Sequence, residues 1–433
     1  MRRAASNTFP SDRPPMLKFI HAADIHLDSP LRGLDQYDGC PAETIRGAAR
    51  RAFENLIQLA IAEKVDFILL AGDIYDGDWP DYTTGLFFIE QLKKLKAKNI
   101  PVVLLYGNHD AQSRITKQLT LPDNTQVLNV DSPQTLKLGK LPVAIHGQGF
   151  AHQAEDRNIA LVYPPAVPGH FNIGMLHTSL DGREGHATYA PCSKAELMTH
   201  GYQYWALGHI HQRESVNGDG KLRIEFPGNV QGRHIRETGA KGCLLVEVDA
   251  KLNAMPEFRA LDVFRWADLA ISAADAETLD DVLAEAGSAI LEAKANAGRR
   301  ALAVRLNITC PATLCAKLAD DLDKLRAELT AQLPDEVWLE KVKLRPTAAP
   351  DAVQDLGDAG TVVQAVLDGI TADRAHFDGD CGKMIGTLPA ELRGPFTMKS
   401  DEDMQKQFEE LFQEIRERAA LLLGAGSRTE GSP

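Results

Sequence analysis

Short apolar runs alternate with amphipathic stretches along the first 250 residues of the chain. Runs such as DFILLA and PVVLLY are apolar at nearly every position, as is typical of strands buried on both faces of a sheet. The stretches 43–64 and 82–98 carry apolar residues at helical spacing. Strands are predicted at 17–22, 66–71, 101–106, 143–146, 172–176, 204–207, 222–226 and 242–248. This alternation predicts an α/β domain over 16–250, with helices on both faces of its sheet structure.

The pattern changes near residue 250. From 256 to 346 it predicts three strands, near 263–272, 301–309 and 336–344, separated by helices at 278–295 and 312–332. We therefore expect a small α+β domain over 251–346. A segment rich in Pro, Ala, Asp and Gly follows, and 401–423 shows the apolar stripe of an amphipathic helix. We interpret 347–433 as a linker and a C-terminal helical segment, and residues 1–15 as a disordered leader.

Composition and charge narrow the class of protein. The 433 residues are 44% hydrophobic and 25% charged, and no apolar run is long enough to span a membrane. Six dispersed cysteines form no paired motif, which favours a reducing, cytoplasmic setting. The formal net charge of −13 argues against a protein coated with basic surface for nucleic acid. It leaves room for a local basic groove, or for metal ions that supply positive charge at a site.

Polar clusters follow five of the predicted strands. They are the motifs HAADIHLD, AGDIYD, YGNHD, MLHTS and ALGHIH. Because the carboxyl ends of strands in α/β sheets point toward one crevice, these clusters can converge. Each motif alone has a simpler explanation, such as a turn, a helix cap or a core histidine. Their shared position after apolar strands favours a common site.

The clusters together supply the ligands of a two-metal site. Two divalent ions held close together need a carboxylate that can bridge them, and Asp73 is the best candidate. The other expected ligands are Asp24, His26 and His211 for the first ion, and Asn108, His177 and His209 for the second. This mixture of oxygen and imidazole ligands suits manganese, iron or zinc, and the absence of thiolates weighs against a structural zinc site.

His109 is interpreted as a catalytic group rather than a ligand. It would stabilise the charge that develops on a phosphoryl group and protonate the leaving oxygen of a phosphoester. Asp110 could hold the imidazole of His109 in one tautomer. The chemistry predicted from the residues alone is therefore hydrolysis of a phosphoester by a water whose pKa is lowered by two metal ions.

The ordered motifs DIH, GDIYD, GNHD, LH and GHIH resemble those of the calcineurin-like metallophosphoesterases. The longer segments FIHAADIHLDSPL and PGNVQGRHIRETGAKG resemble the bacterial DNA repair exonucleases of the SbcD and YhaO type. The resemblance covers roughly 16–250. It implies a four-layer αββα sandwich, a dimanganese site, and exonuclease or endonuclease action on DNA ends. The small domain that follows is similar to the family's capping domain in pattern only.

The resemblance also implies partners and a further site residue. The partners are DNA, a second copy of the chain, and a coiled-coil ATPase of the SbcC or YhaN type. The helix at 401–423 could dock on that ATPase or pack on its own protein. Archaeal and eukaryotic relatives carry a second histidine after the GD motif, whereas this chain has Asp76 there, as SbcD-like bacterial members do. Asp76 joins His109 and Asp110 as a catalytic candidate.

Candidate DNA contacts are Arg114, Arg233 and Arg236, the last two in the segment GNVQGRHIRETG, which is expected at the mouth of the site. No aromatic platform for base stacking is evident, so contacts to the DNA backbone are expected. A DNA nuclease is the leading hypothesis. A phosphatase or small phosphodiesterase would use the same metals, whereas a non-catalytic tethering subunit would not need His109.

Overall fold

The computed structural model describes residues 16–31, 39–76, 82–112, 119–182, 189–217 and 221–347. The chain divides into two compact units. The first unit comprises residues 1–30, 43–232 and 240–263, and the second comprises 31–42, 233–239 and 264–433. The predicted leader 1–15, Arg114 and the C-terminal segment from 348 onward lie outside the described residues.

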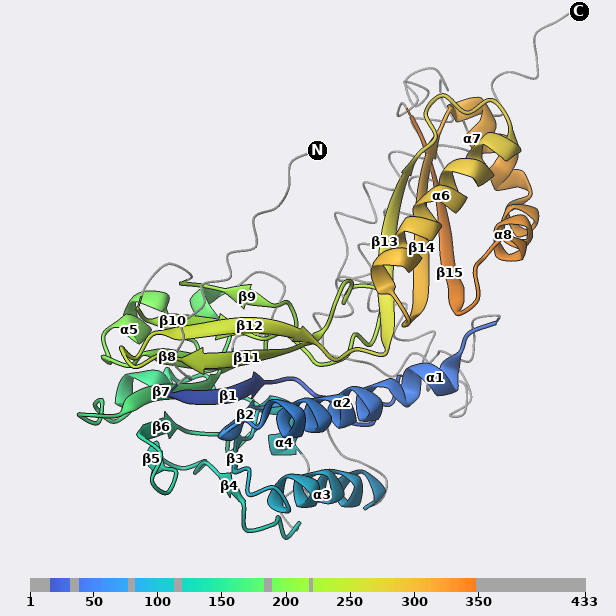
Figure 1. The fold of residues 1–433 in the computed structure, drawn as a ribbon. Helices are drawn as coiled ribbons and strands as arrows, with labels where there is room; N and C mark the ends of the chain where they lie inside the picture. The colour runs from blue at the N-terminus through green and yellow to red at the C-terminus, as the bar shows by residue number, and fades with distance from the viewer. Residues whose placement is uncertain are drawn as a thin grey trace, which may run out of the picture. The chain divides into compact units, whose positions relative to one another are not determined.

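The described part of the first unit contains two six-stranded sheets (Figure 1). The first sheet has the order β12-β11-β1-β2-β3-β4, formed by β1 (Leu17–Ala22), β2 (Phe67–Ala71), β3 (Val102–Leu105), β4 (Thr125–Val127), β11 (Gly242–Val248) and β12 (Ala254–Ala260). The second has the order β5-β6-β7-β8-β10-β9, formed by β5 (Gln134–Lys137), β6 (Val143–Gly147), β7 (Phe171–His177), β8 (Tyr204–Gly208), β9 (Glu214–Ser215) and β10 (Arg223–Phe226). Both sheets mix parallel and antiparallel neighbours.

One apolar core joins the two sheets face to face. Phe19 of β1 stacks on Phe67 of β2, with ring centroids 4.9 Å apart. Phe19 also meets Tyr204 of β8 edge-on at 5.4 Å, and all three side chains are fully buried. Burial of large aromatic side chains removes much apolar area from water, so this contact stabilises the packing of the two sheets.

Helices cover the outer face of the first sheet. The buried stripes of α2 (Ala48–Glu63) and α3 (Thr83–Lys96) pack in one cluster with that sheet (Figure 1). The short helices of the first unit are α1 (Ala42–Arg46), α4 (Asn108–Gln112), α5 (Lys194–Met198), η3 (Ile159–Val162) and η4 (Leu180–Gly182). Among the described residues, α5, η3, η4 and loops form the layer over the second sheet. The predicted α/β class with paired sheets is confirmed.

The second unit contains a three-stranded sheet of order β13-β14-β15, with all strands parallel. Its elements are β13 (Phe264–Ser272), α6 (Leu279–Ala297), β14 (Ala301–Cys310), α7 (Ala312–Asp320), α8 (Leu322–Ala331) and β15 (Val337–Pro346). The α+β prediction is corrected here, because helical crossovers between parallel strands make this an α/β unit. None of the helices described by the structure is long and apolar enough to cross a membrane.

Two local features differ from the sequence prediction. The helix expected over 312–332 is divided at Asp321, whose φ of −133° and ψ of 57° are not helical. The Asp321 side chain instead caps α8 by accepting a hydrogen bond from the Lys324 N–H. Strand β12 pairs antiparallel with β11, so the first unit continues beyond residue 250 to Val263.

Candidate metal centre

The candidate ligands lie where strands of both sheets end. They are Asp24 and His26 after β1, Asp73 after β2, Asn108 at the start of α4, His177 at the end of β7, and His209 and His211 after β8. The structure therefore brings together all the residues that the sequence assigned to two metal ions.

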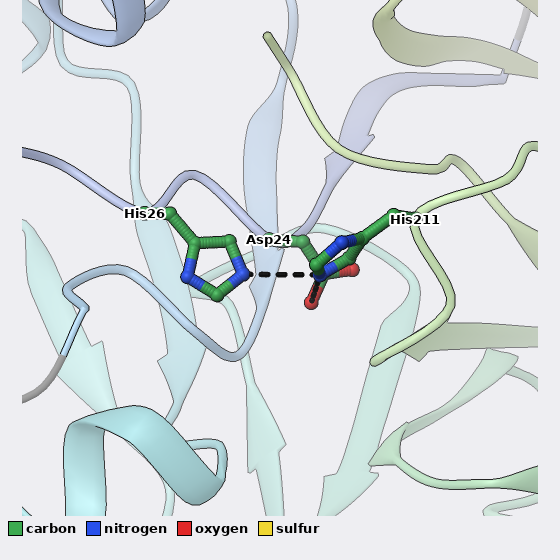
Figure 2. A group of neighbouring side chains, drawn as sticks. All are labelled: Asp24, His26 and His211. Carbon is green, nitrogen blue, oxygen red and sulfur yellow. Dashed lines mark hydrogen bonds and ion pairs between the residues drawn. The ribbon is translucent and has the colours of Figure 1, made fainter. Parts of the chain in front are cut away.

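Asp24, His26 and His211 form one cluster, with a potential ligand atom of each within 4.8 Å of the others (Figure 2). Nε2 of His26 lies 3.1 Å from Nε2 of His211, which lies 4.0 Å from Oδ1 of Asp24. The Asp24 carboxylate also accepts a hydrogen bond from the His209 N–H at 3.1 Å. Two imidazole nitrogens facing each other beside a carboxylate form a donor set that fits a divalent cation.

Asp73, His177 and His209 form a second cluster by the same measure. Nε2 of His177 lies 3.4 Å from Oδ2 of Asp73 and 2.9 Å from Oδ1 of Asn108. The same Oδ2 of Asp73 lies 3.9 Å from Nε2 of His26, in the first cluster. Asp73 thus stands between the two clusters, where a bridging carboxylate would stand.

Four of these residues have a left-handed backbone. The φ angles are 51° at Asp24, 47° at His26, 51° at Asp73 and 99° at His209. Side chains other than glycine rarely adopt such angles, and each costs about 1–3 kcal/mol. Strain of this kind persists where surrounding structure fixes it, and it gathers at functional sites.

Two glycines make room for the ligands. Gly72 has a φ of 93°, and a Cβ there would lie 2.4 Å from Nδ1 of His177. A Cβ on Gly208 would lie 1.9 Å from the carbonyl oxygen of Ala71. Any larger residue at these positions would push apart the strands that carry the ligands, so glycine before Asp73 and before His209 is a requirement of packing.

Burial and opposite charges shift the pKa values in the centre. Burial disfavours ionisation of Asp73, yet the imidazoles of His177 and His109 hold its pKa well below the usual range. Burial likewise disfavours protonation of His177, but the Asp73 carboxylate raises the pKa of His177 to about 9. Burial raises the pKa of Asp24 to about 6. The Asp73 carboxylate is therefore stabilised by neighbouring positive charge, whereas burial outweighs such charge at Asp24, where a metal ion would supply more of it.

His109 forms a third group of this kind with His26 and Asp73, and its side chain is 36% exposed. Nδ1 of His109 lies 2.8 Å from Oδ1 of Asp76, and its ring lies edge-on to the ring of His26, with centroids 5.0 Å apart. Oδ2 of Asp76 accepts a hydrogen bond from Oγ of Ser29 at 2.5 Å. Asp76 therefore orients the imidazole that the sequence singled out.

The prediction that Asp110 orients the imidazole of His109 is wrong. Its carboxylate accepts hydrogen bonds from the backbone N–H groups of Ile74, Tyr75 and Gly107, at 3.2, 2.9 and 3.0 Å. Asp110 is buried, and burial together with the nearby Asp73 raises its pKa to about 7. Asp110 shapes the loop that follows β2, and so places Asp73 and Asp76.

The three basic candidates for DNA contact remain predictions. Arg114 lies outside the described residues, and Arg233 and Arg236 belong to the second unit. Nη2 of Arg233 pairs with Oε1 of the buried Glu237 at 3.2 Å, and the Arg233 backbone N–H donates to Oε2 at 2.7 Å. The charge of Arg233 is thus partly neutralised within its own segment.

An aromatic side chain that no sequence motif indicates lies beside the centre. The ring of Tyr189 lies edge-on to the ring of His209, with centroids 5.4 Å apart. Tyr189 is held by Ser179, whose Oγ accepts its backbone N–H at 2.9 Å. No motif surrounds Tyr189 in the sequence, so only the folded loop could reveal it.

Comparison with known families agrees with this geometry. Residues 17–213 match the model of the calcineurin-like phosphoesterases. Residues 17–213 belong to the calcineurin-like phosphoesterase family. The second unit of this metallophosphoesterase matches the middle domain of metallophosphoesterase YhaO over residues 266–347. The resemblance inferred from the strand-end motifs is confirmed.

The chain is also similar to individual proteins. The metallophosphoesterase is 36% identical over 266 residues to the uncharacterized metallophosphoesterase YhaO of Bacillus subtilis, covering 61% of this chain and 65% of the relative. It is 27% identical over 221 residues to the DNA double-strand break repair protein Mre11 of Sulfurisphaera tokodaii, covering 49% and 53%. A crystal structure of a dimetal phosphatase from Danio rerio aligns at 12% identity and a TM-score of 0.36, over 56% of this chain and 98% of that one. The chain spans less than two thirds of the length of either curated relative.

Proposed function

We propose that this metallophosphoesterase is a DNA nuclease that hydrolyses phosphodiester bonds at DNA ends by a two-metal mechanism. The observation that carries the proposal is Asp73 between two ligand clusters, with His109 beside them and oriented by Asp76. The similarity to a protein named for repair of DNA double-strand breaks supports DNA as the substrate.

The donor set fits two divalent ions, and we propose Mn²⁺ for both. The residues that would hold them are Asp24, His26 and His211 for one ion, Asn108, His177 and His209 for the other, and Asp73 for both. Carboxylate, amide and imidazole donors in one site suit manganese. When bound, the ions would neutralise phosphate charge and lower the pKa of the attacking water.

His109 performs the proton transfer in this proposal. With Nδ1 donating to Asp76, Nε2 is the nitrogen left to carry a proton to the leaving oxygen. The Asp76 carboxylate stabilises the imidazolium form that this step requires. The partial exposure of His109 leaves its ring accessible to a phosphodiester in solution.

The proposal extends to partners and to the roles of the remaining segments. The family resemblance supports a homodimer and a coiled-coil ATPase of the SbcC or YhaN type. The segment 401–423, proposed to dock on that ATPase, lies outside the described residues. Arg114, Arg233 and Arg236 stay candidates for contact with the DNA backbone, and the second unit is proposed as a capping domain.

The test is nuclease activity of the full chain on linear duplex DNA with Mn²⁺. His109→Ala should lower the rate by about 10²–10⁴-fold, the usual contribution of a general acid, because it removes the proton donor. The mutant should still bind two Mn²⁺ ions per chain. His152→Ala, at an exposed histidine, is the matched control and should behave like the wild type.

Two results would contradict the proposal. Cleavage of bis-p-nitrophenyl phosphate without cleavage of DNA would favour the phosphatase or small phosphodiesterase. Full binding of two ions without hydrolysis of either substrate would favour a non-catalytic tether.

A further inference from the structure

His211 is the most exposed residue of its ligand cluster. Its side chain is 24% exposed, against 1% for His26 and 0% for Asp24. It lies in the segment 209–213, which follows β8 without regular secondary structure and begins with the strained backbone of His209. Its ring lies edge-on to the ring of His26, with centroids 4.9 Å apart, and contacts to its backbone add to what fixes the imidazole.

The carbonyl oxygen of His211 accepts a hydrogen bond from Nζ of Lys241 at 2.8 Å. The backbone N–H of Asn229 approaches the same oxygen at 3.4 Å. Lys241 is only 5% exposed, although an ammonium group is costly to remove from water. A buried ammonium on this carbonyl forms a charge-assisted hydrogen bond, which is stronger than a neutral one.

The position of Lys241 is itself fixed. Its carbonyl accepts hydrogen bonds from the N–H groups of Leu261 and Asp262, at 2.9 and 3.2 Å. It directly precedes β11, which pairs with β1 in the first sheet. The turn at Gly228 packs against the same His211 carbonyl, because a Cβ there would lie 2.9 Å from that oxygen.

We propose that Lys241 is a positioning residue that holds His211, through its main-chain carbonyl, at the first metal ion. The inference rests on the proposed two-metal function. The sequence predicted that the segment GNVQGRHIRETG, residues 228–239, forms a DNA loop at the mouth of the site. The turn at Gly228–Asn229, which begins that segment, and Lys241, which follows it, contact the backbone of a metal ligand.

The test is calorimetric titration of the metal-free full chain with MnCl₂. The wild type should bind two ions. Lys241→Met keeps most of the side-chain volume but removes the hydrogen-bond donor. It should lower the affinity for one of the two ions by about 10–100-fold, as does the loss of a group that supports a metal ligand. The affinity for the other ion should not change. Lys251→Met, at an exposed lysine, is the matched control and should bind both ions as the wild type does.

The outcomes separate this inference from the proposed function. Wild-type protein that fails to bind two ions overturns both. Wild type that binds two ions, with Lys241→Met equal to it, overturns the positioning role alone. If circular dichroism shows that Lys241→Met does not fold, Gly228→Ala presses on the same carbonyl without touching the ammonium. It should weaken the same ion selectively, and unchanged affinity in a folded Gly228→Ala protein overturns the inference.

Discussion

At the scale of single residues, Asp76 faces two imidazoles, because its Oδ1 lies 2.8 Å from Nδ1 of His109 and 3.6 Å from Nδ1 of His26. Asp76→Asn keeps the shape of the side chain but removes the charge that orients and stabilises the imidazole. Because a poorly placed catalytic group can cost about 10²-fold, we expect kcat on DNA to fall by about that factor, with KM little changed. Steady-state kinetics with Mn²⁺ measure both constants.

The control for this change is Asp156→Asn, at an exposed aspartate, which should leave both constants unaltered. Mn²⁺ titration of Asp76→Asn should still give two ions per chain. Loss of an ion would contradict a role confined to His109 and show that Asp76 supports metal binding, to which its contact with His26 also leads.

Neighbouring residues in one motif contact different partners, so the contacts of each residue are hard to predict from the sequence. The strand-end motifs correctly predicted which residues gather, because each follows an apolar run that a sheet must bury. They did not predict that Asp110 would bind backbone N–H groups while Asp76 faces His109. Consecutive residues of a helical turn such as α4 point in different directions, so adjacency in sequence says little about the partner of each.

At the scale of elements, strands β2 and β8 of different sheets meet at Gly208. A Cβ on Gly208 would lie 1.9 Å from the carbonyl oxygen of Ala71 and 3.0 Å from its carbonyl carbon. Gly208→Ala must therefore displace backbone, and with it His209. We expect a loss of stability of about 1–3 kcal/mol, as for other overpacked sites, and weaker Mn²⁺ binding.

Thermal unfolding followed by circular dichroism, and Mn²⁺ titration, measure these two effects. Gly287→Ala in α6 is the matched control, because a Cβ there meets no atom within 4 Å. It should be neutral or stabilising, by up to about 1 kcal/mol, since alanine favours a helix over glycine. Equal behaviour of the two variants would show that the strands can separate without cost.

The elements that were not predicted from the sequence lack a clear apolar period or depend on a single capping contact. β12 is an edge strand with Pro256 and partly exposed side chains, so it lacks the continuous apolar run of a central strand. β4 and β9 have three and two residues, too few to show a period. The apolar periodicity of 312–332 continues through Asp321, so the break there depends on a capping interaction and not on the pattern.

At the scale of the whole molecule, the candidate metal centre belongs to one of the two units. Every residue assigned to the two ions lies in the first unit. The second unit has its own sheet and its own apolar cluster. A ligand that binds only the folded state raises the free energy of unfolding by about 2.7 kcal/mol when its free concentration is 100 times its dissociation constant. This gain applies to the unit that binds the ligand.

Metal binding should therefore slow hydrogen exchange in the first unit and not in the second. Hydrogen–deuterium exchange of the full chain can measure this difference. With Mn²⁺, exchange should slow in peptides that cover 24–28, 73–76, 108–110, 177–179 and 209–213, because ligand segments open locally without the ion. The effect should be clearest at Asp24, His26, Asp73 and His209, whose backbone is strained. Peptides of β13, β14 and β15 should exchange at unchanged rates. Asp73→Ala removes the shared carboxylate and should abolish the protection. Equal protection of the second unit would contradict this separation and show that metal binding is coupled to both units.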